Sequence, residues 1–538
     1  MSDGFVWWKH GVVYQIYPRS FMDANGDGVG DLQGILDRLD YLADLGVDAV
    51  WISPIYPSPM ADFGYDVANY TDIHPLFGDL ATFDRLLAGL HARGMKLILD
   101  YVPNHTSDQH PWFLQSRAAR DNPRRDWYIW RDPAPDGGPP NNWEAWFGGS
   151  AWEFDTKTGQ YYLHLFLKEQ PDLNWRNPAV RDAMHDVLRF WLKRGVDGMR
   201  MDVVTFCIKH PDFPDNPPRE DGGFDWRTEN RLQHVYDINQ PGVHDVLKGF
   251  RKVFAEFGED RVIIGETPDM DPVVLASWYG EQFDELHLPF NFMLQHRPWD
   301  AQVMRAGIAA YLDAIPAGAW PNFVLGSHDT HRLATKYGYA NHRAAGLLLL
   351  TLPGTPTLYY GDEIGMPDVP IPPDRVVDPW GRNMPDADVG RDPERTPMQW
   401  DASPNAGFSP AGVETWLPVG DTVLTNVAAQ QADPHSTLAF YRALLTLRKA
   451  TPALHRGSHR DGFAFVDGTP EDVLAYTRQA DGARVLVVIN FSDQPRPLDL
   501  GAVAPSGAIA LSTHWTEGTV DLSALSLQPH EGVLVRLG

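Results

Sequence analysis

The sequence predicts an α/β protein: a (β/α)8 barrel of the TIM type, with a subdomain inserted after the third strand and a C-terminal antiparallel β-sandwich domain. Eight short β-branched runs alternate with amphipathic stretches, which is typical of βα units and a parallel sheet. Polar side chains follow several of these runs. Beyond them, short alternating segments indicate antiparallel strands. At 538 residues the chain is longer than one hydrophobic core usually supports, so smaller domains should accompany the barrel.

The eight runs supply the number of strands that closes such a barrel. In chain order they are 12–17, 49–53, 97–102, 198–203, 262–265, 286–290, 323–326 and 356–360.

The domain boundaries follow from where this alternation is interrupted. We expect the barrel to comprise residues 1–103 and 178–455. Residues 104–177 are too long for a βα loop and rich in Trp, Pro and Gly, which predicts an inserted subdomain B over the barrel mouth. A second excursion, 362–434, should form loops around the same mouth, and 456–538 should form the β domain.

Composition excludes several classes of partner. The net charge of −26 would repel nucleic acid and anionic membrane surfaces, so a small neutral substrate fits better. No apolar run approaches the ~20 residues of a membrane span. The single cysteine, Cys207, cannot form an intramolecular disulfide, and the first residues lack signal-peptide features. We therefore expect a cytoplasmic protein, as a monomer or weak homo-oligomer.

Polar residues gather at the predicted strand ends, where barrel enzymes place their chemistry. They are Asp100, Asn104, His105, Arg200, Asp202, Glu266, His328 and Asp329. Glycoside hydrolysis needs two carboxyl groups beside the scissile bond, and these acids could supply them. Arg200 and Asp202 are two residues apart and so share one strand face, where the cation should hold the acid ionised.

Four segments carry a resemblance to a known family. They are DYVPNH (100–105), GVDGMRMDVV (195–204), GET (265–267) and GSHDTHR (326–332). Together they resemble the conserved regions of glycoside hydrolase family 13, the α-amylase family. The resemblance implies a retaining enzyme with Asp202 as nucleophile, Glu266 as general acid/base and Asp329 as a third acid that binds sugar hydroxyls and distorts the ring.

The same resemblance implies a glucose pocket. Its remaining contacts would be His105, Arg200 and His328 around the glucosyl unit, Tyr65 stacked on its face, and Phe147 and Phe166 in the lining. Trp143, Trp146 and Trp152 could be either core or sugar platforms.

QPDLNW (170–175), which begins with the expected substrate-site residue Gln170, is similar to the region that marks the oligo-1,6-glucosidase branch. This branch includes α-glucosidases, dextran glucosidases and sucrose isomerases. It implies that Asp62 in DFGYD and Arg395 in RTPMQW clamp the 4-hydroxyl of the terminal glucose. Such a clamp closes the pocket at that hydroxyl, which predicts exo-action from the non-reducing end.

A loop after the first run has the spacing of a calcium site. Asp23, Asn25 and Asp27 alternate before Gly28, and Asp31 follows. The resemblance adds the carbonyl of Val29 as a ligand and implies one structural Ca2+, with magnesium as the alternative and no organic cofactor. A turn rich in Asp, Asn and Gly would have the same sequence without an ion.

Linkage preference depends on Val203, since Val at this position is typical of branch members that act on α-1,6 bonds and Thr of those restricted to α-1,4 bonds. We expect hydrolysis of maltose, isomaltose and sucrose, with transglucosylation. A sucrose isomerase or trehalose synthase on the same scaffold is the alternative, and the segment 205–239 over the acceptor side could decide between them. A non-catalytic, transporter-associated relative would have lost acids that this chain keeps.

Overall fold

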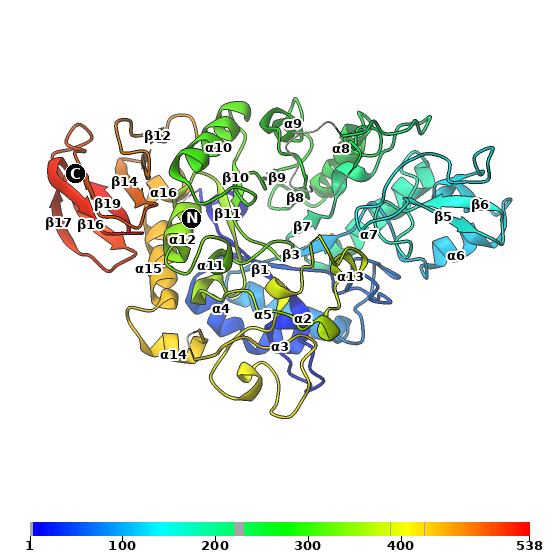
Figure 1. Ribbon diagram of the computed structural model, residues 1–538, viewed down its shortest axis with the longest axis horizontal. Coiled ribbons are helices and arrows are strands. Elements are labelled where there is room, and N and C mark those ends of the chain that lie inside the picture. Colours follow the sequence, from blue (N-terminus) through cyan, green and yellow to red (C-terminus); the bar gives the residue numbers. More distant parts are fainter. Residues whose placement is uncertain (1–3, 220–230, 388, 424) are drawn as a thin grey trace.

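A computed structural model describes residues 4–219, 231–387, 389–423 and 425–538 (Figure 1). Its centre is an eight-stranded parallel sheet, and each of the eight predicted runs contains or overlaps one strand. The strands are β1 (Val13–Ile16), β2 (Ala49–Ile52), β3 (Lys96–Tyr101), β7 (Gly198–Met201), β8 (Val262–Glu266), β9 (Leu288–Phe290), β10 (Asn322–Val324) and β11 (Thr355–Tyr359). The predicted fold class is confirmed.

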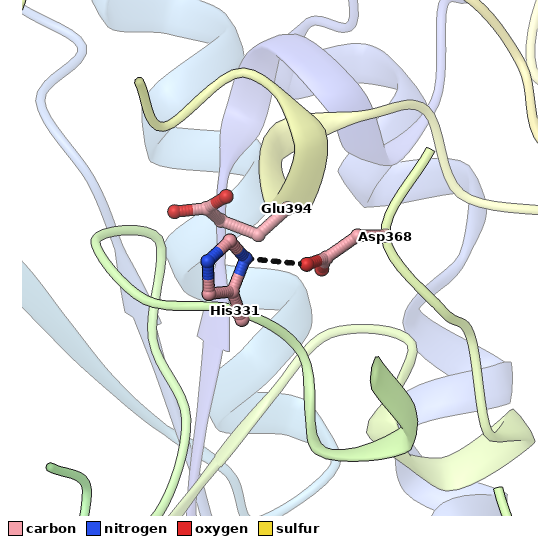
Figure 2. Close-up of side chains that lie close together, drawn as sticks. All are labelled: His331, Asp368 and Glu394. Carbon is pink, nitrogen blue, oxygen red and sulfur yellow. Dashed lines mark hydrogen bonds and ion pairs between the residues drawn. The ribbon is translucent and has the colours of Figure 1, made fainter. Parts of the chain in front are cut away.

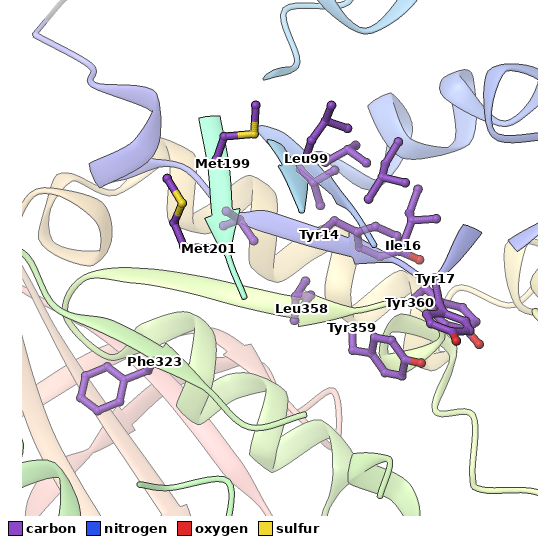
Figure 3. Packing of buried hydrophobic residues seen from close by; sticks show 14 of the residues in the cluster. Tyr14, Ile16, Tyr17, Leu99, Met199, Met201, Phe323, Leu358, Tyr359 and Tyr360 are labelled. Carbon is purple, nitrogen blue, oxygen red and sulfur yellow. The ribbon is translucent and has the colours of Figure 1, made fainter. Parts of the chain in front are cut away.

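The sheet closes almost completely. The strand order is β10-β11-β1-β2-β3-β7-β8-β9, each bonded pair is parallel, and the two end strands, β9 and β10, are in contact. Alternate side chains point inward, where Val13, Trp51 and Ile98 belong to one interior cluster. Their neighbours, such as Tyr14 and Met199, pack outward in the larger core (Figure 3).

Helices surround the barrel, and their ends carry ordinary capping signals. Asn177 caps α7 by accepting the N–H of Ala179, Pro178 occupies its first position, and the helix stops at Gly195, whose φ of 109° suits glycine. The main barrel helices are α3 (Leu32–Asp37), α4 (Leu39–Leu45), α5 (Leu80–Ala92), α7 (Pro178–Arg194), α8 (Val243–Ala255), α9 (Pro272–Ser277), α10 (Ala301–Ala314), α12 (His342–Thr351) and α15 (Thr437–Ala450).

The inserted segment forms a small lobe, which projects from one end of the molecule in Figure 1. It contains α6 (Pro111–Ala118) and a three-stranded antiparallel sheet in the order β4 (Trp130–Arg131), β6 (Gln160–Leu163), β5 (Trp152–Asp155). Trp143, Trp146 and Trp152 are buried in a second hydrophobic cluster here. None of the three lines the pocket at the barrel mouth, so they pack in the core of the lobe.

The C-terminal domain lies at the opposite end of the molecule (Figure 1). Its main sheet is antiparallel, and its two faces pack on different partners: Leu474 and Tyr476 join the core shared with the barrel, whereas Val473 and Ala475 pack under the smaller sheet. The main sheet has the order β12 (Phe463–Phe465), β13 (Val473–Ala480), β14 (Ala483–Asn490), β19 (Gly532–Leu537), β16 (Ser506–Ser512), β17 (Gly518–Asp521), and the smaller sheet pairs β15 (Arg496–Leu498) with β18 (Leu525–Leu527).

The excursion after β11 has little regular structure but returns to the barrel mouth. Its elements are η3 (Asp362–Ile364), η4 (Pro373–Arg375), α13 (Pro379–Asn383), η5 (Pro393–Arg395), η6 (Pro404–Gly407) and α14 (Val427–Ala432). Within the described residues, none of the helices combines the length and the apolar character that crossing a bilayer requires.

Candidate active site

A pocket opens at the carboxyl ends of the barrel strands. The sequence-predicted residues that line it are Asp62, Tyr65, His105, Phe147, Phe166, Asp202, Val203, Glu266, His328 and Asp329. The alternating strand pattern explains the acids, because Asp100, Arg200 and Asp202 lie on the inward face of β3 and β7 or directly after them. In the sheet register, Asp100 lies beside Arg200.

One guanidinium organises the bottom of the pocket. Nη1 of Arg200 lies 2.8 Å from Oδ1 of Asp100 and 2.7 Å from Oδ1 of Asp202, and its Nη2 lies 2.7 Å from Oε2 of Glu266. The backbone N–H of Val203 donates to the same Glu266 oxygen at 2.9 Å. We refer to Asp100, Arg200, Asp202 and Glu266 as the floor.

The floor holds three carboxyl groups against one cation. Burial raises the pKa of Asp202 well above its ordinary value, and the nearby Glu266 and Asp100 raise it further, although Arg200 lowers it. Burial likewise raises the pKa of Asp100 to about 6. The expectation that Arg200 alone holds Asp202 ionised is therefore incomplete, because the excess of acids favours a retained proton.

A second charged group closes one side of the pocket. Nη2 of Arg391 lies 3.1 Å from Oδ1 of Asp62 and 2.7 Å from Oδ1 of Asp378, and its Nη1 lies 3.1 Å from Oδ1 of Asp329. Nη2 of Arg395 contacts the same Asp329 oxygen at 2.8 Å. We refer to these five residues as the wall.

The wall has the opposite electrostatic character from the floor. Although burial disfavours the charged form, His328 and the guanidinium groups of Arg391 and Arg395 lower the pKa of Asp329 below its usual range. Asp62 differs, because burial outweighs the two arginines and raises its pKa to about 6.

The expected clamp residue Arg395 does not reach the pocket surface. It is 1% exposed, and its Nε donates to the backbone carbonyl of His328 at 2.7 Å, behind the lining. Arg391 lines the pocket instead and bonds Asp62. Sequence reasoning missed Arg391, although the same segment, GRDPERTP, contains both arginines. Only the turn of η5 decides which one faces the cavity.

Two other expected substrate contacts also lie behind the lining. Arg200 is 1% exposed beneath the floor acids. Gln170 is fully buried; its Nε2 donates to Oδ2 of Asp62 at 3.1 Å and lies 3.1 Å from Nε2 of His105. Both residues orient groups that line the pocket, so they are positioning residues in this structure.

His105 and His328 are neutral hydrogen-bonding groups in the pocket. Nδ1 of His328 lies 2.7 Å from Nε2 of Gln15, and Nε2 of His328 lies 2.7 Å from the hydroxyl of Tyr65. Since an amide nitrogen only donates, Nε2 of His328 carries the proton. Burial lowers the pKa of His328 well below its ordinary value and that of His105 to about 3.

Further lining residues come from segments with no catalytic motif. Trp380 of α13, Phe206 and Phe292 face the same pocket. Val203, directly after Asp202, has the left-handed backbone angles φ 35° and ψ 44°. This conformation is unusual for a β-branched residue and brings the Val203 N–H toward Glu266.

The predicted cation loop, residues 23–31, folds around its own acids. Oδ1 and Oδ2 of Asp23 accept the N–H groups of Gly26 and Gly28, and Oδ2 also accepts the hydroxyl of Ser409. Asp31 caps α3 through Gly34 and accepts two further amides.

Asn25 and Asp27 each accept an amide two residues ahead, and Asp27 is exposed. The candidate ligand atoms of this loop are all oxygens, and oxygen ligands suit a hard cation such as calcium. The carboxylates of Asp23, Asp27 and Asp31 do not converge as one group, since Asp31 bonds the helix end, so the cation remains a prediction.

Comparisons with known proteins agree with this geometry. Residues 15–457 match the alpha amylase catalytic-domain family, and residues 463–534 match the maltogenic amylase C-terminal-domain family. An oligo-1,6-glucosidase of Parageobacillus thermoglucosidasius is 38% identical over 99% of both chains. A probable alpha-glucosidase of Rhizobium meliloti is 41% identical over 92% of this chain and 91% of its own.

Solved structures extend the likeness to the whole fold. An alpha-glucosyl transfer enzyme superposes with a TM-score of 0.91 at 39% identity, covering 99% of each chain. A trehalulose synthase of Pseudomonas mesoacidophila superposes with a TM-score of 0.90 at 37% identity, covering 100% of each chain. With the catalytic-domain match spanning the barrel and the three acids in one pocket, the chain belongs to the α-amylase family, glycoside hydrolase family 13.

Proposed function

We propose that the protein is a retaining, exo-acting α-glucosidase that releases glucose from the non-reducing end of short α-glucosides such as maltose, isomaltose and sucrose. The observation that carries the proposal is the ion pair between Asp62 and Arg391, which closes one side of the pocket that Asp202 and Glu266 line. A chain of sugars cannot continue past such a wall, so only a terminal glucose fits. The relatives named oligo-1,6-glucosidase and alpha-glucosidase support this substrate class.

The chemistry follows from the two floor acids. A carboxylate oxygen of Asp202 attacks the anomeric carbon, while Glu266 gives its proton to the glycosidic oxygen, and the bond to the leaving sugar breaks. Glu266, now ionised, takes a proton from water, whose oxygen displaces Asp202. The cycle starts with Asp202 ionised, which its contact with Arg200 favours and which burial and the neighbouring acids oppose.

Retention is supported by how closely the two acids are held. The two terminal nitrogens of one guanidinium, Arg200, contact one oxygen of Asp202 and one of Glu266, each at 2.7 Å. Retaining glycosidases separate their carboxyl groups by about 5–5.5 Å, and inverting enzymes need about 6.5–9.5 Å for a water molecule. A shared guanidinium favours the shorter spacing.

The deciding experiment is product analysis on maltose, isomaltose, sucrose and trehalose, with the anomer of fresh glucose followed by NMR. We expect α-glucose from the first three substrates and some glucosyl transfer at high sugar concentration. Initial β-glucose would overturn retention. Conversion of sucrose mainly to an isomer would replace hydrolysis with isomerisation, the activity that the trehalulose synthases are named for.

We also propose one structural Ca2+ in the loop 23–31, held by Asp23, Asn25, Asp27, Asp31 and the carbonyl of Val29. Its all-oxygen donor set supports calcium over softer ions. Removing the ion should lower stability by about 3 kcal/mol, the binding free energy lost when a ligand present at ~100 times its Kd is withdrawn. Chelation followed by thermal denaturation tests this, with Asp27→Ala as the matched variant. A chelated protein that unfolds at the untreated temperature would contradict the proposal.

We further propose a cytoplasmic enzyme that works as a monomer or weak homo-oligomer. The net charge of −26 makes copies of the chain repel one another, most strongly at low salt, which opposes tight self-association. The buried thiol of Cys207 needs no oxidising compartment. Light scattering over a range of protein concentrations tests the oligomeric state. A stable oligomer at the lowest concentration would contradict it.

A further inference from the structure

Three side chains beside the wall converge outside the catalytic floor (Figure 2). His331 lies in the loop after β10, Asp368 in the segment after η3, and Glu394 in η5. Each offers one ligand atom, and these atoms all lie within 4.8 Å of one another. We call these three residues the triad. No other group of three such side chains reaches this spacing in the described parts of the chain.

The triad contains a buried carboxylate oxygen without a partner. Glu394 is 2% exposed, and its Oε2 accepts no hydrogen bond in the structure. Asp368 is fixed on both sides, because its Oδ2 lies 2.6 Å from Nδ1 of His331 and its Oδ1 accepts the N–H of Arg332 at 2.9 Å. Buried polar atoms are normally satisfied by a partner, so the Glu394 oxygen remains available to a ligand.

The ammonium that could satisfy Glu394 is engaged elsewhere. Lys336 lines the same cavity as His331 and Glu394, but its Nζ donates to the backbone carbonyls of Gln295, at 3.0 Å, and Leu325. The lysine therefore does not neutralise the triad by a direct hydrogen bond.

We propose that His331, Asp368 and Glu394 bind a divalent transition-metal ion of the zinc class. One imidazole nitrogen and two carboxylate oxygens are ligands that zinc accepts, whereas calcium and magnesium prefer oxygen alone. His331 and Glu394 line a cavity of about 400 Å³, so a fourth coordination position would face that cavity and hold water. Burial raises the pKa of Glu394 well above its ordinary value, so binding requires both the proton of Glu394 and the proton between His331 and Asp368 to leave for solvent.

Such an ion would tie together two segments that build the wall. His331 follows Asp329 by two residues, and Glu394 follows Arg391 by three. Arg391 and Asp329 already contact each other at 3.1 Å across the same gap. A metal on the triad would therefore restrain the wall from behind without touching the floor.

The test is a calorimetric titration of zinc chloride into the intact protein. Traces of transition metal are first removed with a chelating resin, and calcium is kept in every buffer so that the loop 23–31 is not disturbed. We expect one zinc per chain and a higher unfolding temperature with zinc. Glu394→Gln keeps the shape but loses the charge, and His331→Ala removes an exposed ring; each should lose the tight site and the zinc-dependent stabilisation.

His514→Ala serves as the matched control, because it removes an exposed histidine far along the chain in the C-terminal domain. It should bind zinc as the wild type does. Wild-type protein that binds no zinc, or equal binding by wild type, Glu394→Gln and His331→Ala, would overturn the proposal. These measurements do not use catalysis, so they stand or fall independently of the proposed glucosidase activity.

Discussion

Arginines and carboxyl groups build both the floor and the wall of the pocket, but the pKa of Asp202 and the pKa of Asp329 shift in opposite directions. On the floor, Arg200 serves three carboxyl groups that lie on or directly after barrel strands, and the pKa of Asp202 is raised. On the wall, two arginines from a long loop surround Asp329 and lower its pKa. The number of arginines in contact with each acid therefore distinguishes Asp202, which contacts one and has a raised pKa, from Asp329, which contacts two and has a lowered pKa.

The largest effect should come from the floor. In Asp202→Ala the nucleophile is gone, and kcat should fall by roughly 10⁶-fold, as when the nucleophile of another covalent hydrolase is removed. Steady-state kinetics on maltose measures the loss, and an unchanged unfolding temperature confirms that the variant folds. Turnover above a hundredth of the wild-type rate would remove Asp202 from the role of nucleophile.

Replacing each wall arginine in turn should distinguish the roles of Arg391 and Arg395. Arg391→Ala should lower kcat/KM for maltose by about 10²-fold, since a buried charged hydrogen bond contributes about 1.5–3 kcal/mol and Asp62 is left unpaired. Arg395→Ala, which removes a group behind the lining, should act mainly on stability. Kinetics and thermal denaturation of both variants distinguish these effects. A larger kinetic loss in Arg395→Ala would restore Arg395 as the clamp.

The raised pKa of Asp62 predicts a specific dependence of stability on pH. Its folded pKa of about 6 exceeds the unfolded value of about 3.9, so between these values the folded state binds more protons and stability falls as pH rises. Relative to Asp62→Asn, which is neutral throughout, the wild type should lose about 3 kcal/mol from roughly pH 3 to pH 7. Chemical denaturation of both proteins measures this difference. A constant difference would mean that Arg391 keeps the acid ionised.

The smallest effect concerns Val203, where the floor meets the space for the leaving sugar. Val203→Thr is nearly isosteric and adds one hydroxyl, so it should shift preference from isomaltose toward maltose by about 1–2 kcal/mol. The ratio of kcat/KM for the two sugars reports the shift. A wild type without activity on isomaltose would remove the linkage prediction but leave the glucosidase proposal intact. Part of the segment 205–239, which could override this residue, lies outside the described residues.

Part of the floor could be predicted from strand periodicity, and Glu266 from the family resemblance. Two-residue alternation assigns Arg200 and Asp202 to one face of β7 before any tertiary contact is known, whereas the pairing of β3 with β7 places Asp100 beside Arg200. For the same reason the eight strands, the inserted lobe and the C-terminal sheet were predictable: each depends on local patterns of apolar residues and on loop length.

The wall depended on tertiary structure. Arg391 and Arg395 are four residues apart in an irregular segment without a periodic pattern, so nothing local indicates that one faces the cavity and the other does not. The triad is more distant still, since His331, Asp368 and Glu394 come from three separate loops. Strand periodicity fixes the direction of a side chain over a few residues, whereas the meeting of loops depends on how the entire chain packs.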